Sequence, residues 1–148
     1  MRRLALYLLF LALASAYGAA KDDSVDELKS RFESARPEDR PDLGIEIARH
    51  QLRNADRLYT EGKADQARAA VDDIVAYSEK AREAALQTKK RLKNVEIEAR
   101  KMAEKLRDIK RTLAFEDQPP VEQAIRRLED IRTVLLNEMF SKDKKEKK

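Results

Sequence analysis

Fourteen positions between Ala67 and Leu113 recur at alternating steps of four and three residues, and no other pattern in this sequence restricts its fold as strongly. Twelve of the fourteen are apolar, and neither glycine nor proline occurs between Gly62 and Pro119. Such spacing lines up one side of an α-helix and is typical of a coiled coil or a bundle helix. It predicts one long helix over residues 64–116. The positions, called the seam below, are Ala67, Val71, Ile74, Ser78, Ala81, Ala85, Thr88, Leu92, Val95, Ala99, Met102, Leu106, Ile109 and Leu113.

The centre of the seam is weaker than its ends, because small or polar side chains bury less apolar area. This applies to Ser78, Ala81, Ala85 and Thr88. The adjoining stretch LQTKKRLKNV, residues 86–95, then places four cations within five positions. Because no glycine or proline marks a hinge there, a continuous helix is the simplest interpretation. If the helix breaks, we expect the break between Ala85 and Leu92.

Three further helices are predicted, over residues 24–35, 42–61 and 119–140. Each repeats apolar residues at helical spacing, as in Val25, Leu28, Phe32 and Ala35 of the first. Pro37 and Pro41 separate the first two, because proline removes a backbone donor and restricts the residue before it. Gly62 occupies a C-cap position before a very short turn, so residues 42–61 should fold back as a helical hairpin.

These helices predict an all-α fold in which antiparallel helical hairpins share the long heptad-patterned helix. The first helix, over residues 24–35, would dock on the side. If the weak centre breaks, the same segments would instead form a four- or five-helix bundle. Residues 21–140 make about one domain's worth of chain, and residues 141–148 are expected to form a disordered lysine-rich tail.

The stretch ADRLYTEGKADQARAAV, residues 55–71, resembles the turn of a tetratricopeptide repeat. Ala55, Leu58, Gly62, Ala64 and Ala67 lie at the offsets that such a turn uses. The resemblance covers about half of one repeat, and no second copy follows at the period of 34 residues. It implies at most a single tetratricopeptide-like adaptor module, and ordinary hairpin packing explains the same residues.

The first twenty residues have the pattern of a secretory signal peptide. Two arginines precede an apolar run at residues 4–16, and small residues follow up to Ala20. The run is shorter than the roughly 20 residues that a spanning helix needs, so we expect cleavage before Lys21 rather than an uncleaved anchor. With no cysteine for a lipid anchor, a secreted or periplasmic protein without a transmembrane span is predicted.

Composition narrows the class of protein further. A secreted domain without cysteine has no disulfides, so a hydrophobic core must stabilise it. The net charge of +4 is concentrated at the two ends of the chain, and residues 21–140 sum to −1. A nucleic-acid-binding protein usually has a concentrated basic surface and aromatic residues that stack on bases. Nucleic acid is therefore not an expected partner.

No motif for catalysis, cofactor binding or metal binding is found. His50 is the only histidine, no cysteine is present, and residues 21–148 contain only Gly44 and Gly62 as glycines. Zinc sites need clustered ligands, and phosphate-binding loops need several glycines. We therefore predict a protein that is not an enzyme and has no cofactor or metal.

Residues 87–113 hold ten cations against four anions, whereas the flanking segments 64–86 and 114–140 sum to −2 and −3. A basic stripe of this kind suits an anionic partner such as phospholipid head groups or an acidic protein. The simpler interpretation, which we favour, is that the stripe pairs with the acidic segments of the same molecule. Its residues are Lys89, Lys90, Arg91, Lys93, Arg100, Lys101, Lys105, Arg107, Lys110 and Arg111.

Val75, Leu86 and Ile97 recur at 11-residue spacing, which forms nearly one line along a continuous helix. The line would receive the first helix, or it would bind a client or a second copy. We favour internal docking.

Taken together, these features predict an exported, non-enzymatic helical interaction or scaffold protein of the bacterial cell envelope. A protein partner or self-association is the first expectation, and an anionic envelope surface is the second. The alternative is a periplasmic holdase-like chaperone that uses exposed apolar residues, including Leu136 and Phe140. The chain is similar in kind to helical periplasmic chaperones and envelope adaptors, which are small, cysteine-free and charge-rich, but no motif assigns it to such a family.

Overall fold

The computed structural model describes the backbone of residues 16–146 and the side chains of residues 25–141. Every element in that part of the chain is a helix, which confirms the all-α prediction. Residues 1–15, which contain most of the predicted signal peptide, lie outside the described residues. The described helices include none that is both long enough and apolar enough to cross a membrane. The elements are α2 (Ala16–Ser34), α3 (Arg40–Thr60), α4 (Ala64–Thr88), α5 (Leu92–Thr112), the short 3-10 helix η1 (Phe115–Asp117) and α6 (Gln118–Glu146).

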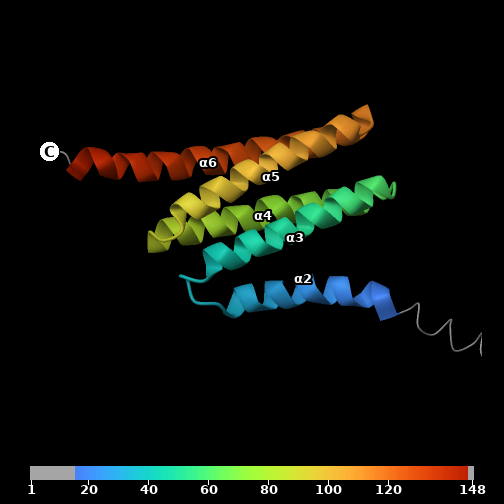
Figure 1. The fold of residues 1–148 in the computed structure, drawn as a ribbon, viewed down its shortest axis with the longest axis horizontal. Coiled ribbons are helices and arrows are strands. Elements are labelled where there is room, and N and C mark those ends of the chain that lie inside the picture. Colours follow the sequence, from blue (N-terminus) through green and yellow to red (C-terminus); the bar gives the residue numbers. More distant parts are fainter. Residues whose placement is uncertain (1–15, 147–148) are drawn as a thin grey trace, which may run out of the picture.

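The five α-helices form a bundle built from two antiparallel hairpins, α3–α4 and α5–α6 (Figure 1). The α3–α4 hairpin lies between α2 on one side and the α5–α6 hairpin on the other. Contacts within each hairpin are the most extensive, and α4 with α6 forms the main contact between the two hairpins. The bundle is therefore two hairpins stacked on each other, with α2 added to the outer face of the first.

The prediction of one long helix over residues 64–116 is wrong, because the chain turns back at residues 89–91. Helix α4 ends at Thr88 and α5 begins at Leu92. The position matches the interval between Ala85 and Leu92 where we expected any break. The physical reason is the weak centre of the seam: folding α5–α6 back onto α3–α4 buries apolar area that one extended helix in a monomer leaves exposed.

The seam itself is confirmed as the inward face of both helices. Twelve of its positions are buried, and only Thr88 and Leu113, which adjoin turns, are partly exposed. Its largest fully buried side chains include Ile74, Met102 and Leu106. Because these residues are surrounded by protein on all sides, truncating one of them to alanine removes about 2–5 kcal/mol of stability.

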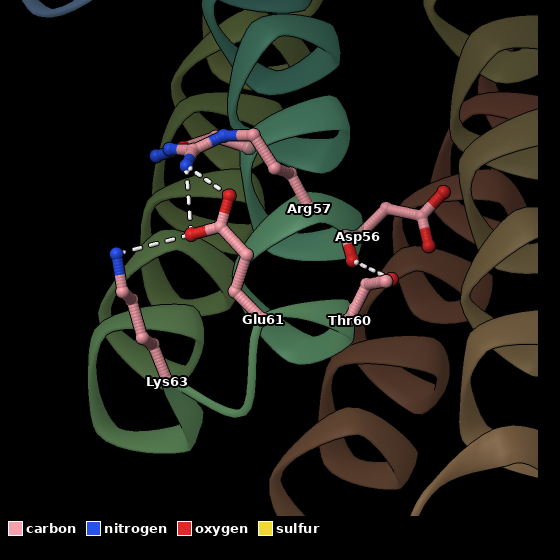
Figure 2. A network of polar contacts seen from close by, with 6 residues as sticks. Asp56, Arg57, Thr60, Glu61 and Lys63 are labelled. Atoms are coloured by element: carbon pink, nitrogen blue, oxygen red, sulfur yellow. Dashed lines mark hydrogen bonds and ion pairs between the residues drawn. The ribbon is translucent and has the colours of Figure 1, made fainter. Parts of the chain in front are cut away.

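The turn between α3 and α4 closes as the sequence predicted. Gly62 has a positive φ of 76°, and the backbone N–H groups of Gly62 and Lys63 donate to the carbonyls of Tyr59 (3.0 Å) and Leu58 (2.9 Å). These two bonds are the Schellman arrangement, which satisfies carbonyls left free at a helix C-terminus. Figure 2 shows the side chains around this turn, where the Glu61 carboxylate forms ion pairs with both Arg57 and Lys63.

Helix α2 packs on the hairpin through two buried residues, Leu28 and Phe32. The Phe32 ring meets the Tyr77 ring of α4 edge to face, with centroids 5.5 Å apart. The Lys80 ammonium of α4 lies 5.6 Å from the centre of the Phe32 ring of α2. Such aromatic and cation–π contacts contribute beyond the area they bury, by roughly 0.5–1.5 kcal/mol each. The first helix therefore docks on the side of the bundle, as predicted.

Helix α6 begins with Pro119 and Pro120 in its first turn, where a missing N–H has no helical partner to lose. It continues to Glu146, past the predicted end near Phe140 and into the segment expected to be a disordered tail. Nothing in residues 141–146 stops a helix, because neither glycine nor proline occurs there. The last turns of α6 run beyond the α4–α5 turn and overhang the bundle (Figure 1).

Candidate partner-binding surface

The turn between α4 and α5 has an unusual backbone. Lys89 and Arg91 have positive φ angles, 58° and 63°, although neither is glycine. A left-handed conformation costs a residue with a Cβ roughly 1–2 kcal/mol relative to a right-handed helix. The Thr88 hydroxyl donates to the Ala84 carbonyl (2.8 Å) and accepts from the Lys90 N–H (3.4 Å), which supports the end of α4. The turn therefore has an unfavourable backbone conformation at Lys89 and Arg91 that is only partly offset by the Thr88 hydrogen bonds.

Two cations of this turn bind other helices. The Lys89 ammonium donates to the Glu138 carboxylate of α6 at 2.9 Å, and the Arg91 guanidinium lies 3.0 Å from the Asp42 carboxylate of α3. Both pairs are half-exposed, so each is worth under about 1 kcal/mol. The two pairs connect the turn to α6 and to α3.

Further along α5, the basic stripe is also used within the molecule. Lys105 pairs with Asp56 of α3 at 3.0 Å, and Arg107 pairs with Glu129 of α6. Three more cations pair with neighbours on α5 itself, in Arg100–Glu104, Lys101–Glu98 and Arg111–Asp108. Seven of the ten stripe residues thus have a carboxylate partner, but only Lys89 and Arg107 pair with one of the acidic flanking segments, 114–140, and none pairs with residues 64–86.

Three cations of the stripe have no carboxylate partner among the side chains of residues 25–141: Lys90, Lys93 and Lys110. Lys90 and Lys93 lie at the α4–α5 turn and are exposed. Lys110 is half-buried near the other end of α5. Among the described side chains, the stripe cations that are exposed and have no carboxylate partner are therefore the two lysines at the α4–α5 turn.

The apolar line predicted through Val75, Leu86 and Ile97 is not continuous, because the turn at residues 89–91 separates Ile97 from the other two. Val75 lines a groove of about 590 Å³ between α4 and the start of α6, together with Pro120 and Ala124. Leu86 packs against the core, and all three residues are half-buried. Helix α2 lies on another face of α4, at Tyr77.

Two of the three large apolar side chains that are exposed among residues 25–141 lie in the second half of α6. Phe140 is 63% exposed and Val134 is 40% exposed, whereas Leu135 between them is fully buried. Leu136 lies one turn before Phe140 and is half-buried. Helices α5 and α6 are antiparallel, and Glu96 of α5 binds Arg132 of α6. Lys93 lies one turn before Glu96 and Leu136 lies one turn after Arg132, so the two residues are at the same level of the hairpin. Leu136, Phe140, Lys90 and Lys93, called the end site below, therefore occupy one end of the bundle.

A part-buried polar cluster joins α2, α3 and α4, and sequence reasoning missed it. The Asp73 carboxylate accepts from the Lys29 ammonium and from the buried Gln51 amide, both at 2.6 Å. Asn54 then donates to the Gln51 side-chain oxygen at 3.3 Å. Asp73 follows Asp72 in a charge-rich helix, and nothing in the sequence distinguishes the acid that faces inward from its exposed neighbour.

Three titratable groups respond to these surroundings. Partial burial lowers the pKa of Lys29, but the hydrogen bond and charge of Asp73 outweigh it, so that its pKa rises overall. Partial burial, aided by Asp117, raises the pKa of Tyr59. Hydrogen bonds from Lys63 and Arg57 lower the pKa of Glu61. Each shift follows from a structural ion pair or from packing, and none lies in the end site.

A second missed contact is the ion pair between Glu96 of α5 and Arg132 of α6. Glu96 is buried, and its carboxylate accepts from the Arg132 guanidinium at 2.9 Å. A buried carboxylate needs such a partner because its desolvation is otherwise unfavourable. Glu96 follows the seam residue Val95 directly, and adjacency to the seam is the only signal for its burial in the sequence.

The described residues contain no group of three or more side chains suited to hold a metal ion. His50 lies in a shallow polar groove between α3 and α5, of about 430 Å³, with Glu46 and Glu98 among its lining residues. No protein-family model matches the chain, and neither a curated protein nor a solved structure shows significant similarity to it.

Proposed function

We propose that this protein is an exported, non-enzymatic interaction protein of the bacterial cell envelope, and that it docks on an anionic membrane surface through its end site. The observation that carries the proposal is the exposure of Phe140, at 63%, near the end of α6, two residues after Glu138, which pairs with Lys89 of the α4–α5 turn. A phenylalanine in that place is available to a partner and contributes little to the packing of the bundle.

Charge supports a membrane surface over an apolar client. Lys90 and Lys93 are exposed at the same end of the bundle, and residues 142–148 contain five more lysines directly after Phe140 in the sequence. Lysines near an anionic membrane contribute about 1 kcal/mol each. An apolar side chain followed by cations is the combination by which interfacial helices bind lipid surfaces. The end site needs no catalytic group for this role.

The first test is sedimentation of the full chain with vesicles of phosphatidylglycerol or of phosphatidylcholine. We expect binding to the anionic vesicles only, because the lysines need negative charge at the surface. Binding should weaken steeply with added salt, since salt screens exposed charges over about 10 Å at 0.1 M. Equal binding to both vesicles, or none to either, would refute the proposal.

Variants then locate the site. Phe140→Ala should lower the affinity for anionic vesicles roughly tenfold, because an inserted phenylalanine contributes about 1.5–3 kcal/mol when fully buried. Lys90→Gln with Lys93→Gln should lower it by a similar factor. Phe115→Ala is the matched control, because Phe115 is 85% exposed but lies near the α5–α6 connection, at the opposite end of the bundle. It should bind as the unmodified chain does.

The holdase-like chaperone remains the second candidate, on the evidence of the same exposed Phe140 and Val134. It predicts that the chain suppresses aggregation of a heat-denatured protein at high salt, where membrane docking fails. If Phe140→Ala abolishes that suppression and vesicle binding is absent, the chaperone role replaces the membrane role.

Export is tested separately, by expressing the full sequence in a bacterial host and fractionating the cells. We expect the protein outside the cytoplasm, with Lys21 as its first residue. A cytoplasmic protein that retains Met1 would contradict the proposed compartment, whatever the vesicles show.

A further inference from the structure

The turn between α4 and α5 joins two helices whose heptad pattern never changes phase. Ala85, Thr88, Leu92 and Val95 follow steps of three, four and three residues across the turn. A turn that permanently separates two helices has no need to preserve this phase, since each helix is oriented on its own. If residues 89–91 became helical, the seam would run along one side of a single helix of roughly 75 Å.

The turn also lacks the residues that stabilise a reversal of the chain. Residues 88–92 contain neither glycine nor proline, and Lys89 and Arg91 adopt left-handed backbone conformations. Lysine and arginine are good helix formers. The local sequence therefore favours a straight helix. Contacts between the two hairpins hold the turn closed, together with the Thr88 hydrogen bonds and the Lys89–Glu138 and Arg91–Asp42 pairs.

Those contacts do not require that both hairpins belong to one chain. The ion pairs Arg127–Glu79 and Lys105–Asp56 join α5–α6 to α3–α4, and the buried residues of α4 and α6 meet in the same interface. An α5–α6 hairpin from a second copy supplies the same side chains in the same geometry.

We propose that the chain forms a domain-swapped dimer in which residues 89–91 straighten and α4 continues into α5. Each copy would place its α5–α6 hairpin on the α3–α4 hairpin of the other. The swap keeps the interface between hairpins and gives Lys89 and Arg91 a helical backbone in place of the left-handed one. Against this gain, association costs the two chains translational and rotational freedom. The proposal goes beyond the membrane-docking role and does not depend on it.

The charges at the turn oppose this exchange. In the swapped dimer the two straightened segments lie side by side, because residue 88 of one copy takes the place beside residue 92 of the other. Lys89, Lys90, Arg91 and Lys93 of both copies then come together, and like charges repel. The cations of this turn therefore favour the closed monomer at low salt. Added salt should raise the dimer fraction, since it screens this repulsion while the interface stays unchanged.

The mass of the full chain in solution, measured by size-exclusion chromatography with light scattering, tests the proposal. We expect a monomer at low concentration and salt, and a dimer whose fraction rises with both. Lys89→Gly with Arg91→Gly should lower the association constant at least about a hundredfold, because glycine favours the left-handed turn and disfavours the straight helix. Lys90→Gln with Lys93→Gln removes charge without changing the backbone preference, and it should raise the dimer fraction.

Crosslinking identifies which hairpins pair. The chain has no cysteine, so Glu79→Cys and Arg127→Cys each introduce a single thiol. A bifunctional thiol reagent that spans the distance between residues 79 and 127 should join the two variants after they are refolded together at high concentration. A single chain that carries both substitutions is the control, and it should crosslink internally when dilute. A monomer at every concentration and salt, or a dimer that yields no crosslink between the two variants, would overturn the proposal.

Discussion

The backbone of Gly44 on α3 packs directly against Tyr77 on α4. A Cβ atom at Gly44 would lie 2.9 Å from the Tyr77 carbonyl oxygen and 3.0 Å from the Ala81 Cβ. Real Cβ atoms do not approach backbone this closely, so the absence of a side chain at this position allows the two helices of the hairpin to meet. The contact lies near the first turns of α3, where Asp42 also forms an ion pair with Arg91 of the α4–α5 turn.

Gly44→Ala should therefore lower the stability of the bundle. Overpacking of this kind costs about 1–3 kcal/mol, and the better helix propensity of alanine returns up to about 1 kcal/mol. We expect a net loss of about 1–2 kcal/mol, measured as a lower urea midpoint with an unchanged slope. Gly62→Ala is a control that loses about 1 kcal/mol through its positive φ alone, since no atom lies near that Cβ. A Gly44→Ala protein as stable as the unmodified chain would show that the helices are not in close contact.

Ser78→Ala is expected to act in the opposite direction. The Ser78 hydroxyl is fully buried in the seam and has no hydrogen-bond partner among the residues that the structure describes. Removing an unsatisfied buried polar group relieves its desolvation and should raise the free energy of unfolding by about 1 kcal/mol. Ser78→Val, which also removes the hydroxyl, should be less stable than Ser78→Ala because it adds volume. A loss of stability in Ser78→Ala would mean that the hydroxyl has a partner in solution.

Asp73→Ala should loosen α2 in particular. The Asp73 carboxylate accepts hydrogen bonds from both Lys29 of α2 and the buried Gln51 amide of α3. Its removal leaves the amide unsatisfied, which should lower stability by about 1–3 kcal/mol. Hydrogen exchange should speed up more in α2 than in α5 or α6.

Asp72→Ala is the matched control for this change, because Asp72 is the exposed neighbour of Asp73 on the same helix. Surface substitutions of this kind usually change stability by less than about 0.5 kcal/mol. If the two variants lose the same stability, the part-buried cluster does not hold α2.

The Glu61 carboxyl should titrate below the ordinary range of glutamate. Its pKa is lowered by hydrogen bonds from Lys63 and Arg57, and Figure 2 shows all three side chains around the α3–α4 turn. A lowered pKa in the folded state means that the contribution to stability is present above the unfolded pKa and is lost as pH falls through the folded pKa. NMR titration of the side-chain carboxyl measures this pKa directly. In Lys63→Gln it should move back up, and an unchanged value would contradict the role of that lysine.

Much of this fold follows from local patterns that a sequence displays directly. Helix α3 and the turn at Gly62 were predicted because a periodic apolar face ends at a residue that accepts a positive φ. The seam residues were predicted as the inward face for the same reason, and the prediction holds on both sides of the turn. Proline in the first turn of α6 and the docked first helix belong to the same group of predictions.

The candidate site was less accessible to sequence reasoning. The basic stripe was recognised, but only the structure separates Lys105, which pairs with Asp56, from Lys90, which pairs with no carboxylate among the described side chains. Exposed Phe140 was named among apolar residues for a client, yet its place near the α4–α5 turn follows only from the tertiary structure, in which Lys89 pairs with Glu138. Asp73 and Glu96 were missed because charge alone does not reveal burial.

The sequence by itself determined which face of each helix is apolar, since that depends only on a residue's spacing from its neighbours along the chain. The tertiary structure alone decided that residues 89–91 turn back. Locally, this segment favours a helix, because it contains good helix formers and preserves the heptad phase. The turn forms because two stacked hairpins bury apolar area that a single extended helix leaves exposed, and that gain outweighs the unfavourable backbone of Lys89 and Arg91.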